Sequence, residues 1–388
     1  MIRQRSRAGQ GRGALLLASL AIAAALTGCG AGQGTGTSGD VTASAKPAAA
    51  SGDGTAAGKQ ALVTVGYQSP TAQTWGALIM KNRKLYEKHL KELAPADQVE
   101  VKWFDATAGS ILNNNMVGGK IQLSILGDMP SLLNGVMGLT QPNYHSVFLA
   151  FDGKGELGRN QAIVVPKGSG IRQVADLAGQ TVSTPIGSSS HRMLLETLRQ
   201  HGLAEKVKIV DQSVTVGMQS IEQGKVAAHS TWEPYPSLIG LKGIGTILQP
   251  GEATKIDYLA GVVANKDWAG ANRIYVTAFL RALIEAHQFA KEHPEETAKI
   301  FEEESKFPPE VCRKMVENIR FDAAVYTKDL GTLDGSIQFL SGLGKLEKKL
   351  ELGPFVDENY LREAAESLKV PYLTETERAG EWLRGKEL

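Results

Sequence analysis

Two short stretches decide the fold of this 388-residue chain: ALVTVGY at residues 61–67 and VEVKWF at residues 99–104. β-branched and aromatic side chains dominate both stretches, which is typical of strands in a packed sheet. The segment between them, residues 72–93, has the pattern of a helix. We therefore predict a strand, helix, strand unit at the start of the folded body.

The same alternation continues through the middle of the chain. Strands that alternate with helices of about ten residues indicate parallel sheets covered on both faces. Two successive series of this kind, before and after residue 162, indicate two α/β units. The expected helices are 110–117, 130–137, 192–201 and one near Met218, and the expected strands are 121–126, 146–151, 162–165, 181–184, 207–210, 226–231 and 258–264.

The chain becomes helical after residue 264. About 330 residues follow residue 60, more than one core usually serves, so we expect an α/β fold with two lobes and a helical C-terminal region. The first helix of that region runs from Tyr275 to Glu292, and Pro294 stops it. Its apolar face is predicted from residues at helical spacing: Val276, Phe279, Leu280, Leu283 and His287.

The N-terminal segment has the layout of a signal peptide. Several arginines precede an apolar run of 13 residues, Ala14–Leu26, which is shorter than the roughly 20 residues of a membrane-spanning helix. The run leads into Thr27-Gly28-Cys29, which resembles the lipobox of bacterial lipoproteins. We expect a signal peptide over 1–28, lipidation of Cys29, and a mature protein anchored at the extracytoplasmic face of the cell membrane. The polar, Gly- and Ser-rich remainder of residues 29–60 is typical of a flexible linker.

Composition excludes several classes of partner and site. The net charge is +1, so we expect no nucleic-acid partner. The only cysteines are Cys29 and Cys312, and the second is expected to be a buried, inert thiol. The histidines have no metal-ligand spacing, and we expect no metal and no cofactor. Residues 153–158 match G-x-G-x-x-G, but the strand predicted after them argues against a dinucleotide site.

The sharpest local motif is PIGSSSH at residues 185–191, between a predicted strand and a predicted helix. Free backbone N–H groups and the helix dipole favour an anion at such a helix start. Ligands of open α/β sheets also bind at the carboxyl ends of strands. Ordinary helix capping by Ser189 or Ser190 is the competing interpretation.

In its context this motif resembles a known family. The solute-binding proteins of ABC importers for sulfonates, taurine and nitrate carry a Gly-Ser-Ser/Thr-x-His element after stretches similar to residues 166–171 and 174–179 of this chain. TWEPY at residues 231–235 is similar to the family's Trp-x-Pro-Tyr element, and residues 279–296 resemble its characteristic helix pair. The resemblance covers residues 61–350 and implies a periplasmic-binding-protein type 2 fold. It implies lobe 1 at residues 61–161, lobe 2 at 162–257, and the rest of lobe 1 with the C-terminal helices at 258–388.

The resemblance also implies the function: a monomeric receptor that clamps a small anionic or zwitterionic solute between its lobes and passes it to ABC permease and ATPase subunits. Sulfonate or taurine is the expected solute. Asp128 is ambiguous, since its carboxylate either caps a helix or meets an amine of the ligand. By position, the implied ligand-binding residues are Gln68, Ser69, Gly127, Asp128, Met129, Ser188, Ser189, Ser190, His191, Trp232 and Glu233.

Other interpretations stay open at this point. Within the same fold the solute is alternatively nitrate or a thiamine-precursor pyrimidine. Relatives of the family include pyrimidine-synthesis enzymes that hold pyridoxal phosphate on a lysine, although an export signal argues against an enzyme of that kind. A ligand-reading sensor domain ranks last. Trp75 is assigned to core packing in preference to a wall of the ligand site.

Overall fold

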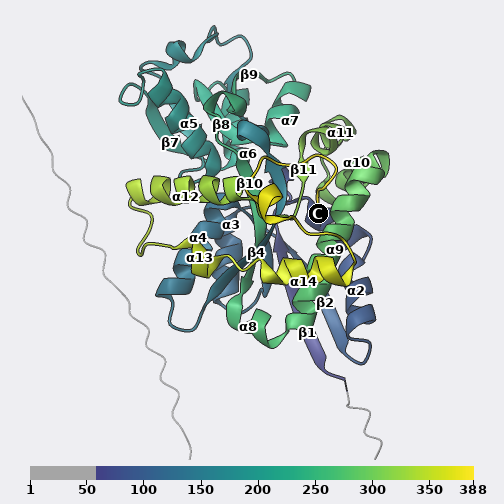
Figure 1. Ribbon diagram of the computed structural model, residues 1–388. Coiled ribbons are helices and arrows are strands. Elements are labelled where there is room, and N and C mark those ends of the chain that lie inside the picture. The colour runs from purple at the N-terminus through teal and green to yellow at the C-terminus, as the bar shows by residue number, and fades with distance from the viewer. Residues whose placement is uncertain (1–57) are drawn as a thin grey trace, which may run out of the picture. The chain divides into compact units, whose positions relative to one another are not determined.

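The computed structural model describes residues 58–388, so the predicted signal peptide, Cys29 and nearly all of the linker lie outside the described residues. Two sheets organise the described chain (Figure 1), and we call the parts built on them lobe 1 and lobe 2. Lobe 1 has a six-stranded sheet in the order β11-β4-β10-β3-β1-β2. Its strands are β1 Gln60–Tyr67, β2 Gln98–Asp105, β3 Leu123–Gly127, β4 Ser146–Gly155, β10 Tyr258–Asn265 and β11 Arg320–Phe321.

Lobe 2 has a five-stranded sheet in the order β7-β6-β8-β5-β9. The β5 strand directly follows the G-x-G-x-x-G match, as predicted, so that motif opens no helix. The chain enters this lobe after β4 and returns to lobe 1 with β10. The strands of lobe 2 are β5 Gln161–Pro166, β6 Thr181–Thr184, β7 Lys208–Asp211, β8 Ala228–Trp232 and β9 Gly245–Pro250.

Strand direction follows from these crossings between the lobes. β1 pairs in parallel with β2 and β3, and β6 pairs in parallel with β7 and β8. β10 is antiparallel to β3 and β4, and β5 is antiparallel to β8 and β9. A strand that enters a lobe from the other lobe starts at the edge where the parallel strands end, so it must run the opposite way. The expectation of purely parallel sheets was therefore wrong for these strands.

Helices cover both sheets, and most follow the predicted pattern. The single helix expected over residues 72–93 is interrupted, because Lys84 has a left-handed backbone with φ 52°. No membrane-spanning candidate occurs among the described helices. In the two lobes the helices are α1 Gly76–Asn82, α2 Leu85–Leu93, α3 Gly109–Val117, α4 Asp128–Thr140, α5 Ser189–Gln200, α6 Val214–Glu222, α7 Tyr235–Leu241 and α8 Lys266–Ala271, with short 3-10 turns at Ala72–Thr74, Glu156–Gly158, Val174–Leu177 and Gly251–Thr254.

The C-terminal region is helical, as predicted. Figure 1 shows α12 lying across the molecule between α5 of lobe 2 and α4 of lobe 1, and α12 contacts both helices. α11 likewise contacts α7 of lobe 2. The helices of this region are α9 Arg273–Glu292, α10 Pro294–Ser305, α11 Pro309–Asn318, α12 Thr327–Gly342, α13 Leu352–Phe355, α14 Asn359–Ser367 and α15 Glu375–Arg378.

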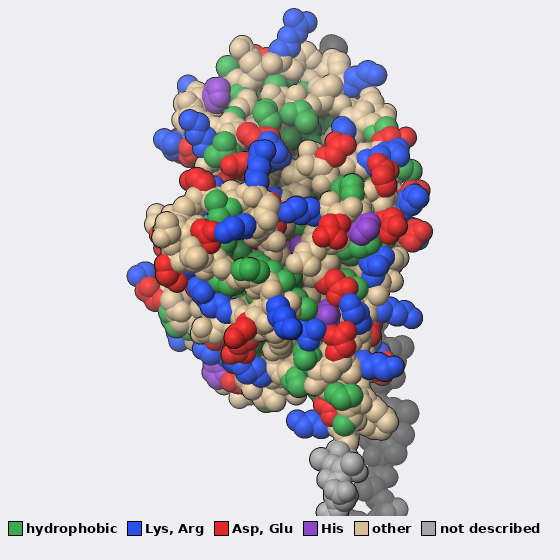
Figure 2. All heavy atoms as spheres, turned by 45° about the vertical axis from the view of Figure 1, so that its right-hand side comes forward, with side chains coloured by type: hydrophobic (Ala, Val, Ile, Leu, Met, Phe, Trp, Pro, Cys, Tyr) green, Lys and Arg blue, Asp and Glu red, His purple; other side chains and the backbone are tan. Residues whose placement is uncertain are grey.

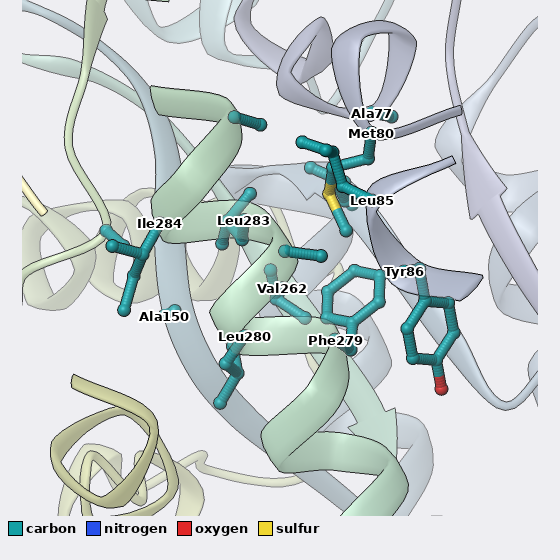
Figure 3. Packing of buried hydrophobic residues seen from close by; sticks show 14 of the residues in the cluster. Ala77, Met80, Leu85, Tyr86, Ala150, Val262, Phe279, Leu280, Leu283 and Ile284 are labelled. Carbon is teal, nitrogen blue, oxygen red and sulfur yellow. The ribbon is translucent and has the colours of Figure 1, made fainter. Parts of the chain in front are cut away.

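The largest core lies between the lobe 1 sheet and α9. All five residues of the predicted apolar face of α9 are buried. Figure 3 shows Phe279 of α9 facing Tyr86 of α2, and the two rings meet edge to face at 5.3 Å. Trp75 is fully buried against Phe301, with ring centroids 4.9 Å apart, which confirms its predicted core role. Cys312 is buried in the same core.

The outer surface seen in Figure 2 carries interspersed basic and acidic side chains. This mixture agrees with the net charge of +1. This face therefore carries no field of a single sign.

Candidate ligand site

A cavity of about 200 Å³ lies where the carboxyl ends of strands from both sheets meet. Lobe 1 contributes residues that follow β1, β2 and β3, and lobe 2 contributes residues that follow β6 and β7 together with the last residue of β8. The residues that line the cavity are Gln68, Thr71, Thr107, Ala108, Gly109, Ser110, Gly127, Pro130, Leu133, Pro185, Ile186, Gly187, Ser188, Ser189, Ser213, Val214, Trp232 and Tyr258.

Four helices begin at the wall of this cavity. They are α3, α4, α5 and α6, and the cap or first residue of each belongs to the lining. α3 starts after Ala108 and α4 after Gly127, and neither of these residues has a side chain that caps the helix. The first N–H groups of an α-helix have no acceptor within the helix, and the dipole places partial positive charge there. The four helix starts thus direct partial positive charge at the cavity, although the wall itself is built from neutral groups.

No acidic, basic or histidine side chain belongs to the lining among the described residues. Apolar groups from both lobes form much of the wall, including Leu133, Val214 and the Trp232 ring. Hydroxyl groups come from Thr107, Ser110 and other short side chains. A ligand in this cavity therefore meets hydrogen-bond donors without a formal counter-charge, and apolar surface for an organic tail.

The structure places the sequence-predicted residues in two groups. Gln68, Gly127, Ser188, Ser189 and Trp232 lie on the cavity wall. The other six predicted residues do not line the cavity: Asp128, Met129, Ser190, His191 and Glu233 are buried, and Ser69 is half-buried.

The serine-rich loop is held mainly by its own hydrogen bonds. Ser188 is the N-cap of α5 and accepts a hydrogen bond from His191 N at 3.2 Å, while its hydroxyl donates to Pro185 O at 2.6 Å. Ser190 is fully buried and pairs with the Thr184 hydroxyl at 3.1 Å. Capping therefore occupies the hydroxyl of Ser188, and hydrogen bonds to neighbouring hydroxyls occupy that of Ser190, so α5 offers a ligand its first backbone N–H groups.

His191 supports this loop from behind. Its Nδ1 accepts a hydrogen bond from Gly187 N at 3.2 Å, which leaves the ring proton on Nε2. The ring packs edge to face on Phe339 of α12, with centroids 5.6 Å apart. Burial lowers the pKa of His191, so the neutral ring is favoured.

Asp128 joins the two lobes instead of facing the cavity. Its Oδ1 accepts hydrogen bonds from Met129 N at 2.8 Å and from the Ser189 hydroxyl of lobe 2, and its Oδ2 accepts one from the Ser336 hydroxyl at 3.3 Å. Arg192 donates to the same Ser336 hydroxyl at 2.7 Å. Burial raises the pKa of Asp128, while the Ser189 hydroxyl and Arg192 oppose this rise.

Trp232 and Glu233 also connect the lobes. The indole Nε1 of Trp232 donates to Pro70 O at 3.0 Å and to Thr71 Oγ1 at 3.1 Å. Glu233 O accepts a hydrogen bond from Ala72 N at 3.0 Å. The Glu233 carboxylate accepts hydrogen bonds from Ser237 N and its hydroxyl, at 3.1 and 2.8 Å, and burial raises its pKa.

The sequence did not point to the lobe 1 loop that starts α3 or to the two residues that start α6. These residues are Thr107, Ala108, Gly109, Ser110, Ser213 and Val214. The signal was present, because both segments join a predicted strand to a predicted helix, as residues 185–191 do. Without a distinctive motif, only the packing of β2 beside β1 and of β7 beside β6 shows that they share one site.

Comparison with known proteins relates this arrangement to a family. Residues 158–297 match the family model described as NMT1/THI5 like. Proteins that carry the name aliphatic sulfonates-binding protein are 27% identical over 262 residues in Escherichia coli strain K12 and 24% identical over 291 residues in Bacillus subtilis strain 168. The matches cover 66% and 74% of this chain, and 75% and 84% of the two relatives.

Solved structures share the fold. The alkanesulfonate-binding protein SsuA from Xanthomonas axonopodis pv. citri, bound to MOPS, superposes with a TM-score of 0.66 at 22% identity, over 78% of this chain and 99% of SsuA. The desulfurization enzyme DSZB superposes with a TM-score of 0.57 at 13% identity, over 79% of this chain and 99% of the enzyme. The resemblance read from the sequence is thus confirmed: residues 158–297 match the NMT1/THI5-like family model, proteins named aliphatic sulfonates-binding protein are similar in sequence, and the fold is that of the solved SsuA structure.

Proposed function

We propose that this chain is the substrate-binding protein of an ABC importer, which captures a small organic oxyanion between its lobes and delivers it to the permease. An organic sulfonate is the solute that the cavity suits best. The sulfonate-binding relatives and the shared fold support this assignment. Closure of the lobes around the ligand would present one defined form to the permease and its ATPase subunits.

The observation that carries the proposal is the chemistry of the cavity wall. Four helix N-termini and several hydroxyls meet there, and no charged side chain lines it among the described residues. A sulfonate group has three acceptor oxygens and a single negative charge, which such a wall can satisfy with donors and dipoles. The apolar part of the wall favours an organic tail over bare nitrate.

We assign the ligand contacts to the residues that line the cavity. From the sequence prediction these are Gln68, Gly127, Ser188, Ser189 and Trp232. We add the starts of α3 and α6, where Ser110 and Ser213 line the wall. Asp128 is assigned to lobe closure, since its carboxylate already accepts hydrogen bonds from Ser189 and Ser336.

The absence of an acidic side chain from the described lining distinguishes between aliphatic sulfonates and taurine. Taurine carries an ammonium group, and an ammonium ion buried without a carboxylate partner is costly. Asp128 is the acidic residue for which the sequence left a ligand amine open as a partner, and its oxygens accept hydrogen bonds from protein donors behind the wall. We therefore assign a higher affinity to propane-1-sulfonate, which has a methyl group where taurine has the ammonium group.

We propose binding without catalysis, although an enzyme shares the fold. Among the described residues, no lysine lines the cavity to form an internal aldimine, and no cysteine lines it to act as a nucleophile. Cys312 lies in the core, and burial raises its pKa to about 11. Purified protein should accordingly lack the visible absorbance of a pyridoxal phosphate aldimine.

The N-terminal prediction completes the proposal. We propose that acyl chains on Cys29 anchor the protein at the extracytoplasmic face of the cell membrane, and that the linker lets a monomeric two-lobed body reach its permease. Two or more acyl chains are needed for stable anchoring, because one chain alone binds only marginally. Globomycin, which blocks lipoprotein signal peptidase, should cause the uncleaved precursor to accumulate, whereas a Cys29→Ser variant should be released from membranes.

Titration calorimetry tests the proposed function directly. The probes are propane-1-sulfonate, taurine, sodium nitrate and a hydroxymethylpyrimidine, with melting temperature as a second measurement, because a ligand of the native state raises stability by mass action. We expect propane-1-sulfonate to bind most tightly. Binding of nitrate or the pyrimidine, with no response to either sulfonate, would overturn the assignment of the solute.

A further inference from the structure

A chain of three polar side chains leads from lobe 2 to the lobe 1 wall of the cavity. The N–H of Trp232 Nε1 in β8 is shared between Pro70 O at 3.0 Å and Thr71 Oγ1 at 3.1 Å, and Gln68 Nε2 approaches the same Thr71 oxygen at 3.5 Å. Gln68 and Thr71 are only 4% and 3% exposed, so water cannot readily satisfy their polar atoms. All three residues line the cavity.

The hydrogen bonds of this group are incomplete. The two side-chain nitrogens that approach Thr71 Oγ1 are both donors, so neither can accept the hydroxyl hydrogen of Thr71. Gln68 Oε1 is buried and has no hydrogen-bond partner among the described residues. This oxygen lies beside Gly109 at the start of α3: a Cβ atom added to Gly109 would be 3.3 Å from Gln68 Oε1. A ligand oxyanion that approached the start of α3 would therefore meet an acceptor atom there and not a donor.

A half-turn of the Gln68 amide corrects both defects. The terminal torsion of glutamine is broad and roughly two-fold, so the turn leaves the shape of the side chain almost unchanged. After the turn, Oε1 accepts the Thr71 hydroxyl hydrogen, while Thr71 Oγ1 still accepts Trp232 Nε1–H. Gln68 Nε2 then points to the side of Gly109, which belongs to the cavity wall at the start of α3.

We propose that a bound oxyanion holds the Gln68 amide in this turned orientation, and that Thr71 is the positioning residue that couples it to Trp232. This inference rests on the proposed function. The Trp232–Thr71–Gln68 relay forms only when lobe 2 brings the indole to Thr71. It therefore links lobe closure to recognition of an acceptor atom on the ligand, and it selects against ligands that present a donor there.

The test is a double-mutant cycle on the full chain, with affinity for propane-1-sulfonate measured by titration calorimetry. Thr71→Val removes the hydroxyl at nearly constant shape and should weaken binding several-fold, up to about tenfold, the effect of losing one hydrogen bond between neutral groups. Thr71→Ser keeps the hydroxyl and should restore most of the affinity. In a Gln68→Met background, Thr71→Val should have little further effect, because the relay has already lost its acceptor.

Additive effects of Thr71→Val and Gln68→Met would overturn the relay, since a merely structural role of Thr71 does not depend on the amide. A second measurement uses the wild-type chain and cannot fail through misfolding. The side-chain amide ¹⁵N resonance of Gln68 should shift on addition of propane-1-sulfonate, and an unchanged resonance would equally overturn the proposal.

Two further outcomes separate this inference from the proposed function. A wild-type chain that binds no sulfonate refutes the function itself and the relay with it. In the other outcome, the wild-type chain binds propane-1-sulfonate, and a Gln68→Glu variant binds taurine more tightly than the wild type does. The proposed function then stands. That result would overturn the relay, because Oε1 would then face a donor on the ligand.

Discussion

Replacing Asp128 by asparagine tests whether this buried carboxylate holds the lobes together. The carboxylate accepts hydrogen bonds from Ser189 of lobe 2, from Ser336 of α12 and from Met129 N. Asparagine has nearly the same shape but only one acceptor oxygen, and its NH₂ group faces a hydroxyl that formerly donated to it. One of the two serine hydroxyls must therefore turn away or lose its partner.

The magnitude follows from the number and kind of bonds lost. A hydrogen bond to a charged group contributes about 1.5–3 kcal/mol, and the Ser189 bond is the one that crosses between the lobes. Both lobes line the cavity, so weakening the Ser189–Asp128 hydrogen bond raises the free energy of the closed, ligand-binding form. We expect the affinity of Asp128→Asn for propane-1-sulfonate to fall roughly 10- to 100-fold.

Calorimetry gives the affinity, and small-angle scattering with saturating ligand gives the degree of closure. Asp176→Asn is the matched control, because Asp176 accepts hydrogen bonds only from neighbours in lobe 2, including Arg172 N and Gln173 N. It should leave the affinity unchanged. If Asp128→Asn had the same affinity and the same scattering profile as the wild type, the carboxylate would not stabilise the closed form.

Three further predictions concern stability. Lys154 and Asp329 form a fully buried ion pair at 2.7 Å, so Lys154→Met should lower the free energy of urea unfolding by about 3–5 kcal/mol, because Asp329 is left buried without its counter-charge. A Lys154→Met variant as stable as the wild type would disprove this. Burial lowers the pKa of His229 to about 4, so stability should fall by roughly 2 kcal/mol from pH 7 to pH 5, as the unfolded imidazole takes up a proton first. A His229→Gln variant with the same pH dependence would contradict this. Gly217→Ala should destabilise by about 1–3 kcal/mol, because its Cβ would lie 2.0 Å from the His229 ring, whereas Gly240→Ala meets nothing within 4 Å and should not.

The sequence alone predicted most elements of the fold and the segment that begins α5, but not β9, β11, α7 or α8. Local patterns were sufficient for β1, β2 and the buried face of α9, because side-chain periodicity directly reflects which face is buried. Local patterns did not predict the antiparallel direction of β5 and β10, which depends on where the chain crosses between the lobes.

Only the tertiary structure separated the residues that line the cavity from those that support it. Ser188 and Asp128 both belong to polar segments at strand ends, yet Ser188 lines the wall and Asp128 bonds to Ser189 and Ser336 behind it. The partners of Asp128 lie 61 and 208 residues away along the chain, and Thr71 and Trp232 are 161 residues apart. No local pattern records such distant pairs, because they form only when two sheets and α12 pack together. The sequence therefore showed that polar groups follow the strands. Packing decided which of those side chains line the cavity and which support it from behind.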